Sequence, residues 1–455
     1  MNILMKKKTA FLLLLFYNVI TPCWAYHTEG TGENYSLYRL SQTEGSGVTM
    51  EIRDGTFYYT LNENDTISAG DHFQCTETCV VQFADGIVLV VEGTADFQGQ
   101  RKTFTATEGA NSAVGICLND TPEATNFGNC TFIGVGVKYI GKSSGSLYAC
   151  TFTDNNGNIG QSALVLGNSD TPYTISHCRF TNNPKAAIAS AANIPSLVTI
   201  EDSEFLQNGT ANGNTPQLNL TASSMVAVKN CDIVGDSEHT MVGGIGVSNF
   251  FATEGTDITI YNCRIRENRY GIGTVGPMSI RIEKNDLINN CHEVNPMNGG
   301  SGISLYDPYG QTEAILTGNY IEGSLWGITV IGCKKVNLGW LEKGGDYNPG
   351  GNVFKDNGNN GQLYDLYNNS ANTVYAQANT WNVNEQTEEQ IETVIFHKND
   401  NPSLGEVIFW PAANTTDINR MHTHIQDADV YDLQGHKTAV RSKGIYIING
   451  KKVVR

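Results

Sequence analysis

The sequence predicts an all-β protein, a single-stranded right-handed parallel β-helix of about ten or more coils that ends in a short carboxy-terminal β-tail. One observation is that a short phrase recurs with a period of about 28 residues. A second is that 48 glycines and many asparagine-rich turns separate apolar runs of period two. Because none of these runs is long enough to bury a face alone, the repeats must stack on one another.

The recurring phrase consists of an apolar residue, two residues, one small or polar residue, one further residue and a bulky apolar residue. We call its small or polar position the corner residue, because we expect it at the bend between two strands. Successive corner residues are separated by 20 to 34 residues, and stacked coils lie about 4.8 Å apart. The predicted corner column is Cys130, Cys150, Cys178, Ser203, Cys231, Cys263, Asn285, Asn319, Asn352 and Asn379.

The corner column changes from mostly cysteine to asparagine at Asn285. Buried cysteine behaves as a small hydrophobe, whereas asparagine can bond its stacked neighbour and the turn backbone. We expect stacked free thiols, since neighbouring Cβ atoms lie farther apart than the roughly 3.5–4.5 Å of a disulfide. Disulfides within the column are the alternative. Cys75 and Cys79, which we place outside the column, are the better disulfide candidates.

The chain divides into five parts along its length. Residues 1–25 read as a secretory signal peptide, 26–95 as an amino-terminal cap and first coils, and 96–412 as the β-helix. A linker at 413–427 precedes the β-tail at 428–455. A lipid anchor on Cys23 is the alternative to cleavage after Ala25, but Pro22 does not suit lipoprotein processing. We therefore expect a protein that is secreted, on the cell surface or in the periplasm.

The repeat resembles the right-handed parallel β-helix superfamily, the pectin-lyase-like fold, over about residues 45–412. The phrases ANTW at 378–381 and EVIFWP at 406–411 are similar to the closing segment of many such bacterial proteins, in which a tryptophan caps the last coil. The superfamily includes lyases, hydrolases, esterases, adhesins and proteins without known chemistry, so this resemblance predicts a fold more than an activity.

The tail contains YDLQGH and KGIYIINGKK, and it is similar to the carboxy-terminal ends of exported Bacteroidota proteins. In some members such an end is a sorting signal, which implies secretion machinery as a partner. His436 stands where arginine is usual. The alternative is a small β-appendage packed against the end of the helix.

The net charge of −17 disfavours binding to nucleic acid and to anionic membranes. After the signal, the sequence contains no run of 18 or more apolar residues, which is the length needed to span a bilayer. We expect a monomer whose candidate partner is a polysaccharide, and an anionic one would need a local basic patch or a bound cation.

One group of loops carries most of the ionisable residues suited to chemistry. Because these loops connect the same pair of strands in three successive coils, they should project from one side over about 10 Å. His239 or His292 could act as a general base, while Arg266 or Arg269 neutralises an acidic sugar. The candidate catalytic residues are His239, His292, Arg266, Arg269 and Glu293, and Asp236, Glu238 and Glu293 are candidate calcium ligands.

Each of these residues also has a purely structural interpretation. Arg179, Glu204, Asp232 and Arg264 follow the corner residue in four successive coils, so opposite charges can pair along the outside. The histidines can be solvated loop residues. Cys291, His292 and Glu293 match no zinc spacing.

Aromatic residues offer a surface for binding sugar. Phe250, Phe251, Tyr306, Tyr309 and Trp326 fall on loops or outward positions, where rings can stack on sugars or cover the edge of the stack. Two functions remain. The favoured one is a non-catalytic glycan-binding or structural surface protein. The alternative is a polysaccharide lyase, or another carbohydrate-active enzyme, that acts on uronate-containing glycans.

Overall fold

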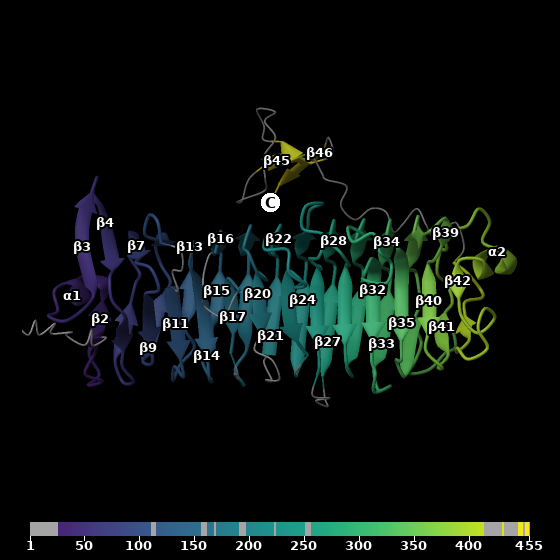
Figure 1. Cartoon of the computed structure of the whole chain (residues 1–455), viewed down its shortest axis with the longest axis horizontal. Helices are drawn as coiled ribbons and strands as arrows, with labels where there is room; N and C mark the ends of the chain where they lie inside the picture. Colours follow the sequence, from purple (N-terminus) through teal and green to yellow (C-terminus); the bar gives the residue numbers. More distant parts are fainter. Residues whose placement is uncertain are drawn as a thin grey trace, which may run out of the picture.

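The computed structural model describes residues 26–110, 115–155, 162–167, 170–190, 197–222, 224–250 and 256–413, together with the backbone of 430–431, 445–448 and 451–454. The chain winds into one elongated stack of coils that runs from the first strands to α2 (Figure 1). Each complete coil contributes one strand to each of three sheets, A, B and C, in the chain order A, B, C. The signal peptide, most of the linker and Phe251 lie outside the described residues.

Sheet A follows the long loops that leave sheet C. In the described part of the chain it has 14 strands. They are β1 Tyr26–His27, β5 Asp65–Ile67, β8 Val88–Val91, β11 Gly115–Asn119, β14 Gly136–Ile140, β17 Leu164–Leu166, β20 Ile188–Ser190, β23 Leu218–Thr221, β26 Ile245–Ser248, β29 Ile272–Val275, β32 Ser301–Tyr306, β35 Trp326–Ile331, β40 Leu366–Asn369 and β42 Ile395–Phe396.

Sheet B likewise has 14 strands among the described residues. They are β2 Asn34–Ser36, β6 His72–Gln74, β9 Thr94–Phe97, β12 Asn126–Gly128, β15 Ser146–Tyr148, β18 Tyr173–Ser176, β21 Leu197–Glu201, β24 Met225–Lys229, β27 Asp257–Tyr261, β30 Ser279–Glu283, β33 Glu313–Thr317, β36 Lys335–Gly339, β41 Val374–Ala376 and β43 Val407–Ile408.

Sheet C has 13 strands within the same described ranges. They are β3 Val48–Arg53, β4 Thr56–Leu61, β7 Cys79–Phe83, β10 Lys102–Ala106, β13 Cys130–Ile133, β16 Thr151–Thr153, β19 Arg179–Thr181, β22 Glu204–Leu206, β25 Asp232–Val234, β28 Arg264–Arg266, β31 Asp286–Ile288, β34 Tyr320–Glu322 and β37 Val353–Lys355. Its first pair, β3 and β4, is antiparallel, and the other pairs of sheet C are parallel.

Short elements complete the two ends. Helix α1 Leu37–Ser41 lies at the first coils, and α2 Glu388–Glu392 lies at the last. A hairpin of β38 Gly358–Asn359 and β39 Gln362–Leu363 projects near the end of the stack. The tail contains β44 Val430–Tyr431, β45 Ile445–Ile448 and β46 Lys451–Val454, which form an antiparallel sheet. In the described residues, no helix is long and apolar enough to cross a membrane.

The register confirms the predicted corner column. Asp232 pairs with Arg264, and Arg264 with Asp286, so Cys231, Cys263 and Asn285 stand in register directly before these strands. The residue before the corner adopts a positive φ in each of these coils, as at Asn262 with φ 53°. This single left-handed residue turns the chain sharply from sheet B to sheet C.

The corner asparagines form the hydrogen-bonded ladder that their chemistry predicts. Asn285 Nδ2 donates to Asn319 Oδ1 at 3.0 Å, Asn319 to Asn352 at 2.9 Å, and Asn352 to Asn379 at 2.9 Å. At the junction of the two parts of the column, the Cys263 amide donates to Asn285 Oδ1 at 2.9 Å. Each buried amide thus satisfies both its donor and its acceptor.

The cysteine part of the column holds free thiols, and the alternative of disulfides within it is not seen in the structure. The structure differs from the prediction for Cys75 and Cys79 in two respects. It holds both as free thiols, with their sulfurs 3.8 Å apart and not covalently bonded. Cys79 also belongs to the column, because it pairs in register with Lys102, which in turn pairs with Cys130. The sequence concealed this because lysine does not fit the small-residue pattern.

The core is a narrow cylinder of stacked side chains. The inward residues of sheet C include five phenylalanines whose rings lie face to face in successive coils, with centroids 4.4–5.2 Å apart. They are Phe104, Phe132, Phe152, Phe180 and Phe205. At the far end, Trp381 is buried and stacks on Phe354 with centroids 4.9 Å apart, which agrees with the expected tryptophan cap.

The outer charges of sheet C follow the predicted register. Arg179 pairs with Glu204, Glu204 with Asp232, and Asp232 with Arg264. Arg179 and Glu204 form an ion pair. Exposed pairs of this kind contribute little to stability, so they account for charged residues in these strands without a functional role.

Candidate functional site

Apart from Arg266, which ends strand β28, the predicted catalytic residues lie in three loops that all connect sheet C to sheet A. These loops are residues 235–244, 267–271 and 289–300. A second amide ladder anchors the bases of the last two loops, where Asn268 and Asn290 follow strands of sheet C. Asn268 Nδ2 donates to Asn290 Oδ1 at 3.1 Å, and Asn268 Oδ1 accepts from Gln217 Nε2 at 3.0 Å. Because these hydrogen-bonded amides are buried, they fix the positions at which the loops leave the β-helix.

His239 is held by a carboxylate of its own loop. Its Nδ1 lies 2.9 Å from each oxygen of Asp236, and the Asp236 Oδ1 also accepts the backbone amides of Glu238 and His239 at 2.8 Å. Burial disfavours the charged form of Asp236, but these hydrogen bonds outweigh it and lower its pKa. The carboxylate orients the imidazole, as in many general bases.

His292 is held by a carboxylate from the preceding coil. Its Nε2 lies 2.8 Å from Glu267 Oε2. Glu293 does not contact this pair through any interaction that the structure shows, and its Oε1 instead accepts the amide of Asn295 at 3.0 Å. The two predicted bases are therefore each bonded to a different carboxylate.

The two predicted arginines have different surroundings. Arg266 lies 3.7 Å from Asp232, in the charge pattern of sheet C. Arg269 donates to Asn214 Oδ1 and to the carbonyl oxygen of Asn298, and these bonds hold it between two loops. In the described structure the Nε of Arg269 is buried and has no hydrogen-bond partner.

The carboxylates expected to bind calcium do not form a ligand set. Within the described ranges, no group of three or more histidine, cysteine, aspartate or glutamate side chains is arranged to hold a metal ion. Asp236 uses its oxygens on His239 and on backbone amides, while Glu293 turns toward Asn295. The local turns therefore engage Asp236 and Glu293 within their own loops, and calcium binding by Asp236, Glu238 and Glu293 stays a prediction.

A groove of about 820 Å³ lies over the outer face of sheet A, beside these loops. Its floor follows one row of outward residues in register across six strands, from β23 to β40. The row consists of Asn219, Gly246, Gly273, Ser304, Thr329 and Tyr367. Strands about 4.8 Å apart give this row a length of about 24 Å along the helix axis.

Two glycines of the floor let neighbouring side chains pack directly against the sheet. A Cβ atom at Gly273 would come within 2.9 Å of the Tyr270 ring, and one at Gly246 within 2.7 Å of Pro216. Tyr270 therefore lies directly on the glycine floor. Burial raises the pKa of Tyr270 to about 12, so its hydroxyl keeps its proton at neutral pH.

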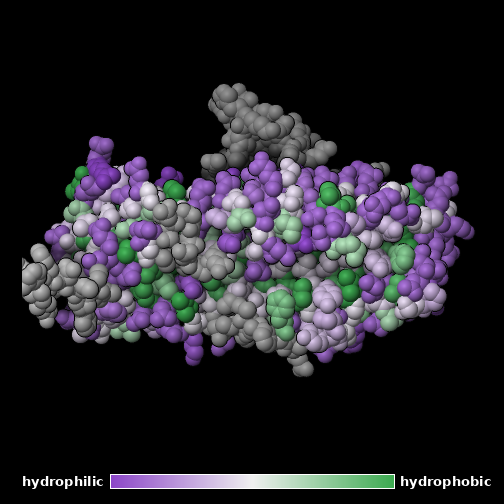
Figure 2. Space-filling model, viewed as in Figure 1, coloured by the Kyte–Doolittle hydropathy of each residue, from purple (hydrophilic) through white to green (hydrophobic). Residues whose placement is uncertain are grey.

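The walls of the groove are rich in aromatic and apolar side chains. One wall, at the beginnings of the strands, contains Trp326, which donates from Nε1 to the carbonyl oxygen of Pro296 at 3.1 Å and stacks on Tyr367. The other wall, at the strand ends, contains Phe250 and Tyr306, which are 58% and 40% exposed. Figure 2 shows hydrophobic patches among hydrophilic ones along the length of the molecule.

Among the seven predicted site residues, only Arg269 lines this groove. It is also the one charged side chain among the described lining residues; the others are aliphatic, aromatic, amide, hydroxyl or glycine. The sequence analysis identified Phe250, Tyr306 and Trp326 as candidate sugar-stacking residues, and the structure brings all three to the groove. Tyr309 does not line it.

Sequence reasoning missed the floor row and Tyr270. The signal was present in the recurrent strands GGIGV, GIGT, GISL and GITV, whose outward positions are glycine, serine or threonine. Small outward residues in consecutive coils indicate a depression, because a parallel β-helix aligns them in one row.

The comparison with protein families agrees with this architecture. Residues 136–332 match the protein family described as "Right handed beta helix region". Similar solved structures include a double mutant of the periplasmic alginate epimerase AlgG, with 11% identity, a TM-score of 0.47 and coverage of 84% of both chains. The pectate lyase Pel9A is 13% identical, with a TM-score of 0.24 and coverage of 77% of this chain and 71% of the other. No curated protein gives a significant match.

The parallel ladders and the match over residues 136–332 identify the chain as a right-handed parallel β-helix of the kind that the repeat predicts.

Proposed function

We propose that this chain is an exported surface protein that binds a polysaccharide chain in the groove over sheet A without cleaving it. The observation that carries the proposal is a groove about 24 Å long with a hydroxyl and amide floor between apolar and aromatic walls. Sugar rings have one apolar face and a rim of hydroxyls, so they pack on aromatic rings and bond to such polar groups.

The ionisable groups favour binding over catalysis. Acid–base chemistry on a glycan needs a group that gains or loses a proton near neutral pH. Among the described lining residues, Arg269 stays charged, and burial keeps the Tyr270 hydroxyl protonated by raising its pKa to about 12. Arg269 can instead anchor a hydroxyl or carboxylate of the ligand.

A matched pair of tyrosines tests the proposal. Tyr306 lines the groove and is 40% exposed, whereas Tyr309, three residues later, is 57% exposed and lies outside it. We expect Tyr306→Ala to weaken binding by roughly 3- to 10-fold, because it removes a stacking surface. Tyr309→Ala should leave binding unchanged. Affinity electrophoresis against a panel of neutral and uronic acid polysaccharides measures both variants.

Absence of binding to every polymer in the panel would oppose the proposal. Equal losses for Tyr306→Ala and Tyr309→Ala would place any binding elsewhere on the surface.

A second candidate function is a polysaccharide lyase that acts on uronate-containing glycans. The observation in its favour is that His239 and His292 are each oriented by a carboxylate, at 2.9 Å and 2.8 Å, on the loops that flank Arg269. The same polymers, followed by the ultraviolet absorbance of unsaturated uronate, test it. Activity that is lost in the double variant His239→Ala, His292→Ala would replace the binding proposal with this one.

A further inference from the structure

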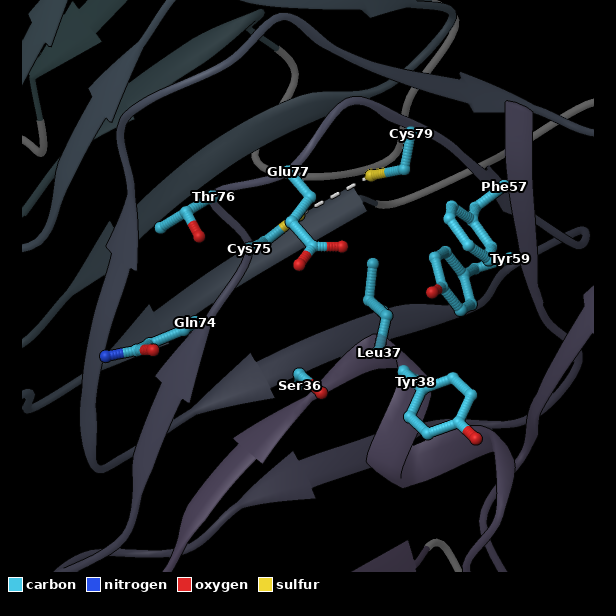
Figure 3. A pocket seen from close by; sticks show the side chains of 10 residues that line it. All are labelled: Ser36, Leu37, Tyr38, Phe57, Tyr59, Gln74, Cys75, Thr76, Glu77 and Cys79. Atoms are coloured by element: carbon cyan, nitrogen blue, oxygen red, sulfur yellow. Dashed lines mark hydrogen bonds between the residues drawn. The ribbon is translucent and has the colours of Figure 1, made fainter. Parts of the chain in front are cut away.

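Two cysteines at the amino-terminal end of the helix form a contact that the groove does not use. Cys75 directly follows β6, and Cys79 begins β7 after a turn of three residues. Their side chains point toward each other, with the sulfurs 3.8 Å apart, at one end of a cavity of about 370 Å³ (Figure 3). Each residue is only 5% exposed.

A buried lysine occupies the next position of the corner column. Lys102 is the register partner of Cys79 on one side and of Cys130 on the other, and its side chain is fully buried. Its Nζ donates to the carbonyl oxygens of Gln98 and Gln100 at 2.8 and 2.6 Å. No ion pair between Lys102 and a carboxylate is present in the described structure, and a buried ammonium is costly without a negative partner.

Of the two column neighbours of Lys102, Cys79 is the better partner. The Cys130 sulfur donates to the carbonyl oxygens of Phe97 and Gly128 at 3.4 Å, so it carries its proton. The Cys79 sulfur contacts the Cys75 thiol, which can donate to it. This hydrogen bond lowers the pKa of Cys79 against the opposing effect of burial, and the charge of Lys102 acts in the same direction.

The cavity gives a small molecule access to both sulfurs. Leu37 and Tyr38 of α1 and the rings of Phe57 and Tyr59 line it opposite the cysteines (Figure 3). Glu77 is the one carboxylate among the described lining residues, and because it is exposed, solvent screens its charge. The mostly apolar lining suits an uncharged sulfur–sulfur bond rather than a metal ion.

We propose that Cys75 and Cys79 form a redox-active dithiol in which Cys79, beside the buried Lys102, is the attacking thiolate and Cys75 is the resolving thiol. The oxidant is a low-molecular-weight disulfide. The Cys79 thiolate attacks one of its sulfurs, which forms a mixed disulfide and releases the other half as a thiolate. That thiolate takes the proton of Cys75. The Cys75 thiolate then attacks Cys79 Sγ and displaces the second half as a thiolate, which is protonated from solvent when it leaves.

The two thiols are thus oxidised to one disulfide, and the small disulfide is reduced to two thiol equivalents. Bond formation shortens the sulfur separation from 3.8 Å to about 2.05 Å, which closes the turn at the first coils.

The test uses the reduced full-length chain and oxidised glutathione. At timed intervals the reaction is stopped with acid, the remaining thiols are alkylated under denaturing conditions, and the tryptic segment 54–101 is weighed, since it holds Cys75, Cys79 and no other cysteine. We expect this segment to lose two hydrogens. The buried thiols Cys231 and Cys263, which have no lysine at an adjacent position of the corner column, serve as the internal control and should react at least about tenfold more slowly.

Two variants separate the roles of the sulfurs. Cys75→Ser should accumulate the mixed disulfide on Cys79, because the resolving thiol is missing, while Cys79→Ser should leave Cys75 largely unreacted. Lys102→Met should slow the reaction of Cys79 by about tenfold or more. Reaction of the column thiols at the same rate as segment 54–101 in the unmodified chain would overturn the proposal. So would accumulation of the adduct on Cys75 in place of Cys79.

Discussion

The buried carboxylate of Asp365 should make the carboxy-terminal coils less stable as the pH rises. Asp365 is fully buried and directly precedes strand β40 of sheet A, near the carboxy-terminal end of the stack. Its Oδ2 accepts the amide of Asn382 at 2.7 Å, and its Oδ1 has a long contact of 3.4 Å with Asn357 Nδ2. These two bonds compensate only partly for the loss of water, so burial raises the pKa from 3.8 to about 7.

The sign of the effect follows from where the proton binds. Because the folded state holds the proton more tightly than the unfolded state, stability is greatest below the unfolded pKa and falls as the pH rises toward about 7. A rise from 3.8 to about 7 corresponds to a loss of roughly 4 kcal/mol across this window. Above the folded pKa the loss is complete and the contribution of Asp365 no longer changes.

Asp365→Asn isolates this contribution, because asparagine has a similar shape and does not ionise. Near pH 4 we expect the variant to be no more stable than the unmodified chain. Near pH 8 we expect it to be more stable. The difference in the free energy of unfolding between the variant and the unmodified chain should change by up to about 4 kcal/mol from pH 4 to pH 8. Urea unfolding followed by tryptophan fluorescence reports the transition, since Trp381 is buried next to Asn382. A stability difference between the two chains that is constant from pH 4 to pH 8 would refute the reasoning.

Three further substitutions test the core, the corner ladder and the groove. Phe180→Ala should lower the free energy of unfolding by about 3–5 kcal/mol, since it leaves a cavity in a continuous ring stack; a loss below 1 kcal/mol in urea unfolding would contradict this. Asn319→Ala removes the bonds on both sides of a buried amide, including the 2.9 Å bond to Asn352, and should cost about 2–4 kcal/mol in the same assay, whereas an unchanged midpoint would show that the ladder is not stabilising. Gly273→Ala places a Cβ atom 2.9 Å from the Tyr270 ring, so it should weaken polysaccharide binding while far-ultraviolet circular dichroism stays unchanged; full affinity would argue against Tyr270 as part of the binding surface.

Much of the fold could be predicted because its signal is local and repeated. The corner residues are spaced by one coil, and the bulky residue two positions later points inward each time, as Phe180 and Ile265 do. Stacking then follows from the need to bury short apolar strands. The topology that brings the loops of His239, Arg269 and His292 to one side follows from the same repeat.

The candidate site could be predicted less completely than the fold, for a physical reason. Loop lengths vary between coils, so each loop forms its own turns and satisfies its own charges. Asp236 binds His239 and Glu267 binds His292, which the repeat alone could not indicate. A calcium site would need carboxylates from separate loops to lie close together. Within the described residues, no group of three or more histidine, cysteine, aspartate or glutamate side chains is arranged to hold a metal ion.

The sequence by itself determined the coil, its corner column and the aromatic residues available for sugar, because these depend on residue type and spacing along the chain. Only the tertiary structure decided that Gly246 and Gly273 lie in one floor row beneath the aromatic walls, and that Lys102 is buried in the corner column beside Cys79. Both arrangements depend on register between coils. Register is set by the packing of the whole stack against the insertions in each turn, so it cannot be read from any one repeat.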